Sequence, residues 1–286
     1  MDSLKILPLG ACLLHGPLGY AIRENRNISC TTSTMGTGTP ALYSVGEALQ
    51  AFKFFRGEID IPQPYLPLVD IDAGFDPRSQ EGHRFFDGDV AMFEPNMPVD
   101  IHADGVYFNR ACIISRVLNP IKAVSEDAAR TAYAWWTQGI TVGNDAVTVE
   151  LANKIIGFIP QEMPDKELAI DLLRKLRGIR HSRETLTQGI RQVRDEAGLP
   201  MVIVTYTHNY MPDGRAMPWP PDFVEDTIAA AKTLDLPIFH PADFVVREGV
   251  ANALMKDRTH YQDHFSAMIG REMVKFGSAV LQRRAA

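Results

Sequence analysis

The stretch Leu4-Lys5-Ile6-Leu7-Pro8-Leu9-Gly10-Ala11-Cys12 decides the fold. A short apolar run that ends at a glycine is typical of a buried strand followed by a tight turn. Pro8 is only a mild objection, although proline removes one donor from a strand ladder. Because a helix is expected over 15–26, directly after the turn, the stretch predicts the first strand–helix unit of an α/β protein.

Four further strands are expected downstream of this unit, and helical patterns separate most of them. The clearest strand is the run Met201-Val202-Ile203-Val204-Thr205-Tyr206. Apolar residues at helical spacing predict a helix over 41–56, and others over 146–158, 222–234, 243–254 and from 264 to the C-terminus. The remaining strands are expected at 28–32, 89–93 and 237–241.

The alternation of strands and helices predicts an α/β fold with a central parallel sheet of about five strands, covered on both faces. Residues 57–88 are rich in Pro, Asp and Gly and are expected to be irregular. Helical pieces are expected over 106–136, and one long helix or two over 166–197. We therefore predict a single domain over residues 1–286, with a helical elaboration at about 104–198.

Composition narrows the classes of function and compartment. The net charge of the 286 residues is −6 and no basic cluster stands out, which argues against a nucleic-acid partner. Three cysteines are too few for a disulfide scaffold. No apolar stretch reaches the ~18 residues that a membrane helix needs, and Pro8 and Gly10 break the N-terminal run that a signal peptide would require. We expect a cytoplasmic protein without a membrane partner.

Chemically useful side chains follow the predicted strands, where the carboxyl ends of a parallel sheet form one edge. A thiol, glycines, an amide and an aspartate–histidine pair are the parts that acyl transfer requires: a nucleophile, oxyanion donors, a base and a group that orients the base. In chain order these are Gly10 and Cys12, Gly36 and Gly38, Glu94 and Asn96, His208 and Asn209, and Asp257 and His260.

The order of these blocks resembles the SGNH hydrolase superfamily. Gly10-Ala11-Cys12 matches the block in which that superfamily carries its serine nucleophile, and Asp257-Arg258-Thr259-His260 matches its Asp-x-x-His block. A cysteine in third place is similar to the GSCFA family and to capsular-polysaccharide acyltransferase-like proteins with a Gly-Asn-Cys motif. Phe93-Glu94-Pro95-Asn96 is a looser match to Gly-x-Asn-Asp, and residues 100–200 match nothing in the resemblance.

The resemblance implies a flavodoxin-like three-layer sandwich and a defined set of roles. Cys12 is expected to be the nucleophile, His260 the base and Asp257 its orienting carboxylate. Oxyanion or substrate contacts are expected from Gly10, Gly36, Gly38, Asn96, His208 and Asn209. The N-terminus of the helix after Cys12 is expected to favour the thiolate. No metal or cofactor is required, although acyl-CoA is a possible co-substrate.

Several alternatives stay open at this stage. His264 competes with His260 as the base, and the two could share a metal through their spacing of four residues. A second asparagine block occurs at Gly143-Asn144-Asp145. Cys12 could be inert packing, as most buried cysteines are, and His15 could either face the site or cap its helix.

We expect an enzyme that transfers an acyl group to a small hydroxylated or carbohydrate substrate. An esterase that uses the same residues with water as acceptor is the first alternative. A binding or assembly protein that keeps the fold without catalysis is the second. The sequence does not predict the acyl group, the acceptor or the oligomeric state.

Overall fold

The computed structural model describes residues 3–30, 40–78, 87–206, 209–210, 216–217, 222–257 and 260–285. The chain divides into two compact units, and each is described by itself. The first unit comprises Met1–Glu58, Asp76–Met97 and Arg183–Ala286. The second unit comprises Ile59–Phe75 and Pro98–Ser182.

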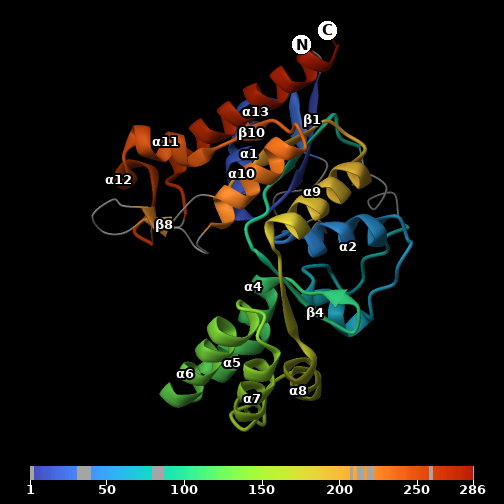
Figure 1. Ribbon diagram of the computed structural model, residues 1–286, viewed down its shortest axis with the longest axis vertical. Helices are drawn as coiled ribbons and strands as arrows, with labels where there is room; N and C mark the ends of the chain where they lie inside the picture. The colour runs from blue at the N-terminus through green and yellow to red at the C-terminus, as the bar shows by residue number, and fades with distance from the viewer. Residues whose placement is uncertain are drawn as a thin grey trace. The chain divides into compact units, whose positions relative to one another are not determined.

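The first unit is built on a five-stranded sheet in which every neighbouring pair of strands is parallel (Figure 1). Its order is β10-β7-β3-β1-β2, so the direction of progression reverses between β1 and β3. The predicted parallel sheet of about five strands is confirmed. The strands are β1 (Leu4–Leu9), β2 (Ile28–Cys30), β3 (Val90–Phe93), β7 (Met201–Val204) and β10 (Ile238–Phe239).

Both faces of this sheet are buried, as a parallel sheet requires. Side chains alternate between the faces along each strand, and Ile6, Met92 and Val202 belong to a core cluster that also contains residues of α1 (Cys12–Glu24) and α13 (Asp263–Ala285). On the opposite face of the sheet, Leu7 and Leu9 are among the residues that are also buried. Helices α2 (Val45–Phe55), α9 (Arg183–Ala197) and α10 (Phe223–Thr233) pack in sequence against one another as the second helical layer.

Helices α1 and α13 pack closely because Gly270 lies against Pro17. A Cβ at Gly270 would approach the carbonyl oxygen of Pro17 to 2.1 Å, so only glycine permits this crossing. Arg271 and Glu24 add an ion pair of 2.8 Å between the two helices. The N-terminal helix of the chain and the C-terminal helix are thereby held together.

The first unit is completed by α11 (Pro241–Glu248), α12 (Val250–Ala253), and a two-stranded pair of β8 (Asn209–Tyr210) and β9 (Ala216–Met217).

The second unit contains a sheet that the sequence analysis did not predict. Strands β4 (Val99–Ala103), β5 (Val106–Tyr107) and β6 (Arg177–Arg180) form an antiparallel sheet of order β5-β4-β6. The helical pieces predicted over 106–136 are therefore wrong at β5, and the helices predicted over 166–197 are interrupted by β6. Asp104 and Gly105 join β4 to β5 with φ angles of 51° and 79°, which is the geometry of a tight hairpin turn.

The helices of the second unit surround this sheet. Gly178 of β6 lies so close to the chain at Ile140 that a Cβ there would come within 1.9 Å of the Ile140 carbonyl oxygen. Two six-residue segments are π-helical rather than α-helical: η3 (Ile113–Leu118) and η4 (Trp135–Ile140). The other helices are η1 (Gln63–Leu68), α4 (Arg110–Cys112), α5 (Asn119–Lys122), α6 (Glu126–Ala134), α7 (Asp145–Ile156) and α8 (Lys166–Lys175).

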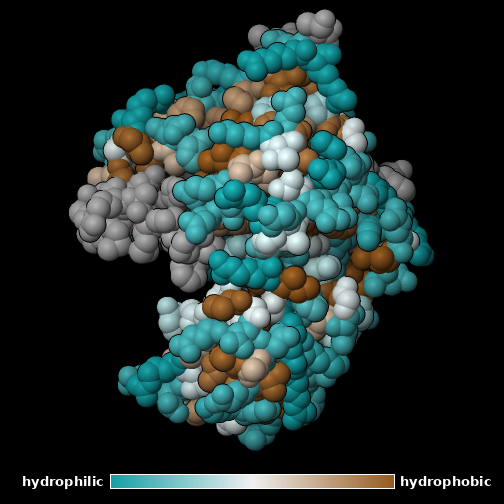
Figure 2. Space-filling model, viewed as in Figure 1, coloured by the Kyte–Doolittle hydropathy of each residue, from teal (hydrophilic) through white to brown (hydrophobic). Residues whose placement is uncertain are grey.

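Helix α9 belongs to the first unit, although the helical elaboration expected at about 104–198 included it. The face of the molecule in Figure 2 is mostly hydrophilic, with small hydrophobic groups among the helices of the second unit. Val142 and Val149 are among the exposed hydrophobic residues there. Within the described part of the chain, no helix is both long enough and apolar enough to cross a membrane.

Candidate active site

The site lies where the parallel strands of the first unit end. Cys12 is the first residue of α1, directly after the turn that ends β1, and Glu94 directly follows β3. Thr205 follows β7 and His240 follows β10. Because these strands run side by side in one direction, their carboxyl ends share one edge of the sheet. The predicted placement of Cys12 at this edge agrees with the structure.

The turn before Cys12 depends on the absence of a side chain at Gly10. A Cβ there would come within 2.8 Å of Leu14 and 2.9 Å of the Glu94 Cβ. The Gly10 carbonyl accepts hydrogen bonds from the backbone N–H of Leu42 at 2.8 Å and from Nε2 of His15 at 3.1 Å. Gly10 therefore allows the turn to lie directly on Glu94, and its carbonyl fixes the turn from two sides.

His15 has a structural role in this turn. Burial lowers the pKa of its imidazole to about 4, against a smaller opposing effect of the bond to Gly10. A neutral imidazole carries one N–H, and Nε2 faces a carbonyl oxygen, so the proton lies on Nε2. The sequence left open whether His15 faces the site or caps its helix; its bond to the Gly10 carbonyl gives it a structural role in the turn.

Glu94 is a buried acid beneath the same turn. Its residue is 1% exposed, and its Oε2 accepts the backbone N–H of Ala11 at 3.2 Å. Burial raises the pKa of the carboxyl to about 8, and the hydrogen bond from Ala11 lowers it by a smaller amount. At neutral pH this carboxyl is therefore mostly protonated and uncharged.

The thiol of Cys12 is reachable but is not a resting thiolate. The residue is exposed, yet its pKa is raised, first by partial burial of the thiol and then by the charge of Glu94. The backbone N–H groups of Cys12 and Leu13 lower the pKa, as a helix N-terminus should, but they are outweighed. The sequence predicts that the helix N-terminus lowers the pKa of Cys12. The net shift of this pKa is instead upward, because desolvation of the thiol is the larger effect.

Asp257 also raises the pKa of Cys12. The two residues are 245 positions apart in the sequence. Electrostatic effects between groups near the surface fade over about 10 Å at ordinary ionic strength. The Cys12 thiol and the Asp257 carboxylate therefore lie within range of an electrostatic interaction, which is the smallest of the effects on the Cys12 pKa.

The loop that carries Asp257 is held at both ends. Leu254 and Tyr261 form an isolated antiparallel bridge, and both side chains are buried in the core cluster that contains Leu13 and Leu14 of α1. The backbone N–H of Met255 donates to the His260 carbonyl at 2.8 Å. The two anchoring residues of the loop and the first turn of α1 therefore belong to the same hydrophobic core.

Asp257 and His260 form a hydrogen-bonded pair on this loop. Nδ1 of His260 lies 2.6 Å from Oδ2 of Asp257, and the His260 backbone N–H donates to Oδ1 at 3.1 Å. The side chains are 48% and 52% exposed, respectively. A carboxylate facing Nδ1 fixes the tautomer with the proton on that nitrogen, which leaves Nε2 as the basic one.

His264 is arranged differently. It is exposed in the first turn of α13, and among the described residues it has no hydrogen bond to a carboxylate. The geometry therefore favours His260 over His264 as the base. No group of three or more His, Cys, Asp or Glu suited to a metal ion occurs within the described residues.

The predicted oxyanion residues fall into three groups. Asn96 is buried two residues after Glu94, its N–H donates to the Tyr43 carbonyl at 3.1 Å, and its side-chain Oδ1 has no hydrogen-bond partner in the described structure. Asn209 lies in the short strand β8, where it pairs with Met217. Gly36, Gly38 and His208 lie outside the described residues.

The second asparagine block belongs to the second unit and has a structural explanation. Asn144 is the N-cap of α7, and its Oδ1 accepts the backbone N–H of Val147 at 3.2 Å. His240 also makes a structural contact, with its Nδ1 hydrogen-bonded to the hydroxyl of Thr205. The sequence analysis left Glu94 without a role, although an acid directly after an entirely apolar strand was a signal of a buried carboxyl.

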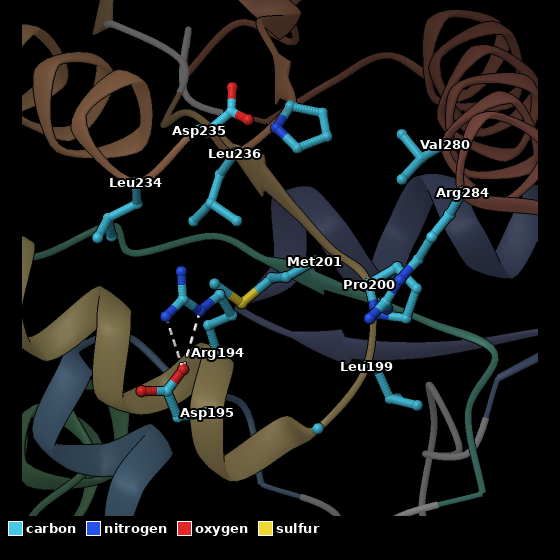
Figure 3. Close-up of a pocket in the computed structure, with 12 residues that line it drawn as sticks. Arg194, Asp195, Leu199, Pro200, Met201, Leu234, Asp235, Leu236, Val280 and Arg284 are labelled. Carbon is cyan, nitrogen blue, oxygen red and sulfur yellow. Dashed lines mark hydrogen bonds and ion pairs between the residues drawn. The ribbon is translucent and has the colours of Figure 1, made fainter.

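A hollow of about 570 Å³ lies at the opposite edge of the sheet, where β7 and β10 begin (Figure 3). Met201, Leu236 and Val280 are among its apolar lining residues, and Arg194 bonds to Asp195 at its rim. None of the predicted site residues lines this hollow. It is separate from the Cys12 region.

The fold and this geometry define an α/β protein with a candidate thiol site at the carboxyl edge of a parallel sheet. A comparison with known protein families gives a match over nearly the whole chain. The protein belongs to the family of TviD N-terminal domains, whose family model matches residues 4–276. No curated protein gives a significant match.

Proposed function

We propose that this protein is an acyltransferase of the SGNH type on a flavodoxin-like first unit, with Cys12 as nucleophile, His260 as general base and Asp257 as the group that orients it. One observation carries the proposal: Asp257 and His260 form the hydrogen-bonded pair that an orienting carboxylate and a base require. A small electrostatic effect of Asp257 on Cys12 supports a place for this pair near the thiol. The strand order β2-β1-β3-β7-β10 supports the flavodoxin-like assignment.

The resting state of the thiol determines the first step. Because the pKa of Cys12 is raised, the sulfur needs a base at neutral pH. Nε2 of His260 takes the proton as the sulfur attacks the carbonyl carbon of an acyl thioester. The tetrahedral intermediate then collapses, the acyl group stays on Cys12, and His260 returns the proton to the departing thiolate.

The second step restores the enzyme. A hydroxyl of the acceptor loses its proton to Nε2 of His260 and attacks the thioester on Cys12. The products are an ester on the acceptor and the free Cys12 thiol, which regains the proton. In both steps negative charge develops on the acyl oxygen, and the backbone N–H of Cys12 with the Asn96 side-chain amide would stabilise it.

The family suggests the acceptor. TviD N-terminal domains are linked to the biosynthesis of the Vi capsular polysaccharide, and a polysaccharide offers many hydroxyl groups for esterification. A cysteine nucleophile also suits a thioester donor, because exchange between two thioesters is nearly balanced in free energy. We therefore propose an acyl thioester as donor and a carbohydrate hydroxyl as acceptor.

The test is to incubate the full chain with acetyl-CoA and to locate acetyl groups by peptide mass spectrometry. We expect acetylation of Cys12, its loss in Cys12→Ala and its slowing in His260→Ala. Cys30→Ala is the matched control and should leave it unchanged, since burial raises the pKa of that thiol to about 12. Acetylation without any preference for Cys12, or none at all, would overturn the proposal.

A second assay separates transfer from hydrolysis by the same residues. Release of free CoA is followed with and without an oligosaccharide acceptor, and a simple acyl ester is tested as an alternative donor. Transfer predicts that the acceptor accelerates CoA release and becomes acylated. Equal release in its absence, with free acid as the product, would show an esterase or thioesterase instead.

A further inference from the structure

Glu94 occupies a position that neither the resemblance nor the family assigns. It follows the four apolar residues of β3, all of them buried, and its carboxyl is sealed from solvent at the edge where Cys12 lies. Burial of a carboxyl group is unfavourable unless its polar atoms are hydrogen-bonded. The Ala11 N–H supplies one such hydrogen bond to the Glu94 carboxyl.

The first contribution is geometric. Helix α1 begins after Ala11, whose side chain makes no capping bond, and Oε2 of Glu94 accepts the Ala11 backbone N–H. A Cβ at Gly10 would lie 3.1 Å from the same oxygen. The two residues before Cys12 thus lie directly on this carboxyl, which fixes the backbone that presents the thiol.

The second contribution is electrostatic. Glu94 is the larger of the two acidic influences that raise the pKa of Cys12, and Asp257 is the smaller one. The pKa of Glu94 is raised to about 8, so its charge appears in the range where a thiol would begin to ionise. Among the described residues, further titratable groups are His15, which stays neutral because its pKa is lowered to about 4, His240 directly after β10, and His260 paired with Asp257.

We propose that Glu94 is a positioning residue of the Cys12 site: its carboxyl holds the Gly10–Cys12 turn through the Ala11 N–H, and its charge state controls how readily the thiol reacts. This extends the proposed function, since the group acts on the same nucleophile. Glu94 does not touch the acyl group itself. It acts through the backbone of the turn and through its electric field.

The experiment compares Glu94→Gln with the unmodified full chain. The glutamine side chain keeps an oxygen that can accept the Ala11 N–H but cannot become charged. The rate of Cys12 alkylation by iodoacetamide is measured from pH 6.5 to 10 by peptide mass spectrometry, which separates Cys12 from Cys30 and Cys112. Glu225→Gln, at an exposed acid in the first turn of α10, is the control and should reproduce the unmodified profile.

We expect E94Q to react roughly threefold to tenfold faster at about pH 9, because removal of the Glu94 charge lowers the pKa of the Cys12 thiol and increases its thiolate fraction. The difference should narrow toward pH 6.5, where the native carboxyl is protonated. Superimposed profiles would overturn the inference. If E94Q does not fold, the unmodified profile decides: two coupled groups give a rise shallower than a one-proton curve, and a simple one-proton curve would overturn the inference.

The geometric part has its own test in Glu94→Leu, which removes the hydrogen-bond acceptor. Acyl transfer at pH 7 should fall mainly in kcat, with E94Q retaining more activity than E94L. Equal activity of the two variants would overturn the positioning role. Because alkylation does not require acyl transfer, a shifted alkylation profile without any acyl adduct would refute the proposed function and leave the role of Glu94 standing.

Discussion

Two regions bring a carboxyl group to Cys12, and they differ in almost every physical property. The turn region, residues 10–15 with Glu94, is largely buried apart from Cys12 and is hydrogen-bonded through backbone atoms, and its acid is mostly neutral at pH 7. In the loop region, 254–261, the side chains of Asp257 and His260 are about half exposed and paired with each other. The contrast sets a buried support for the backbone of Cys12 against an exposed pair for which we propose a role in proton transfer.

The largest effect is expected from the loop region. Asp257→Asn should keep the loop folded, because Leu254 and Tyr261 anchor it, but the amide can present an N–H to Nδ1 and favour the wrong tautomer. By analogy with orienting aspartates in catalytic triads, we expect kcat for acyl transfer to fall about 10³–10⁴-fold. An unchanged rate together with an unchanged melting temperature would remove Asp257 from the mechanism.

The next largest effect is expected at Asn96, two residues after Glu94 of the turn region. Asn96→Ala removes the proposed oxyanion donor and should lower kcat by about 10²–10³-fold with little change in KM. Asn144→Ala is the matched control: it removes a helix N-cap in the second unit and should lower stability by about 1 kcal/mol without changing kcat. If both variants behave alike in the acyl-transfer assay, Asn96 has no special role.

Because the pKa of the buried Glu94 is raised, its contribution to the free energy of unfolding should fall as the pH rises, which is opposite to the usual behaviour of a carboxylate whose pKa is lowered. The pKa of Glu94 is raised from 4.5 to about 8 on folding, so its contribution is fully present below pH 4.5 and is lost as the pH rises through 8. We expect Glu94→Gln to be more stable than the native protein by about 2–4 kcal/mol at pH 8, and the advantage to vanish near pH 4.5. Urea unfolding at the two pH values measures this difference, and a constant difference would contradict it.

The smallest effect concerns the contact between α1, which begins in the turn region, and α13, which follows the loop region. Gly270→Ala places a methyl group against the Pro17 carbonyl, and overpacking of this kind typically destabilises by about 1–3 kcal/mol. Because α13 follows the loop and α1 carries Cys12, acylation should slow as well. Gly74→Ala is the control, since a Cβ there meets nothing within 4 Å beyond its chain neighbours and no proline follows it; it should be neutral or stabilise by up to about 1 kcal/mol. Equal melting temperatures for the two variants would argue against a tight contact between α1 and α13.

The parallel sheet could be predicted from sequence because buried strands are continuous apolar runs between glycine-containing turns. The antiparallel sheet of the second unit could not be predicted in full. Its third strand, β6, is the short segment Arg177–Arg180, and its pairing with β4 spans about eighty residues. The turn at Asp104-Gly105 was a readable hairpin signal that the analysis did not use.

The candidate site shows a similar division. The place of Cys12 directly after the first strand and the pairing of Asp257 with His260 could be inferred from the sequence. The raised pKa of Cys12 could not, because it depends on desolvation and on Glu94, whose burial is a property of packing. The position of Cys12 at a helix N-terminus predicts that backbone N–H groups lower its pKa, and they do. The larger effect, desolvation of the thiol, raises the pKa and cannot be seen in the local sequence.

The bridge between Leu254 and Tyr261 joins the ends of the loop through two core side chains. The anchoring of the loop therefore does not depend on the side chains of Asp257 and His260. Substitution of either residue tests its chemistry with the loop still anchored, whereas substitution at Gly10 or Glu94 also disturbs the backbone contacts of the turn.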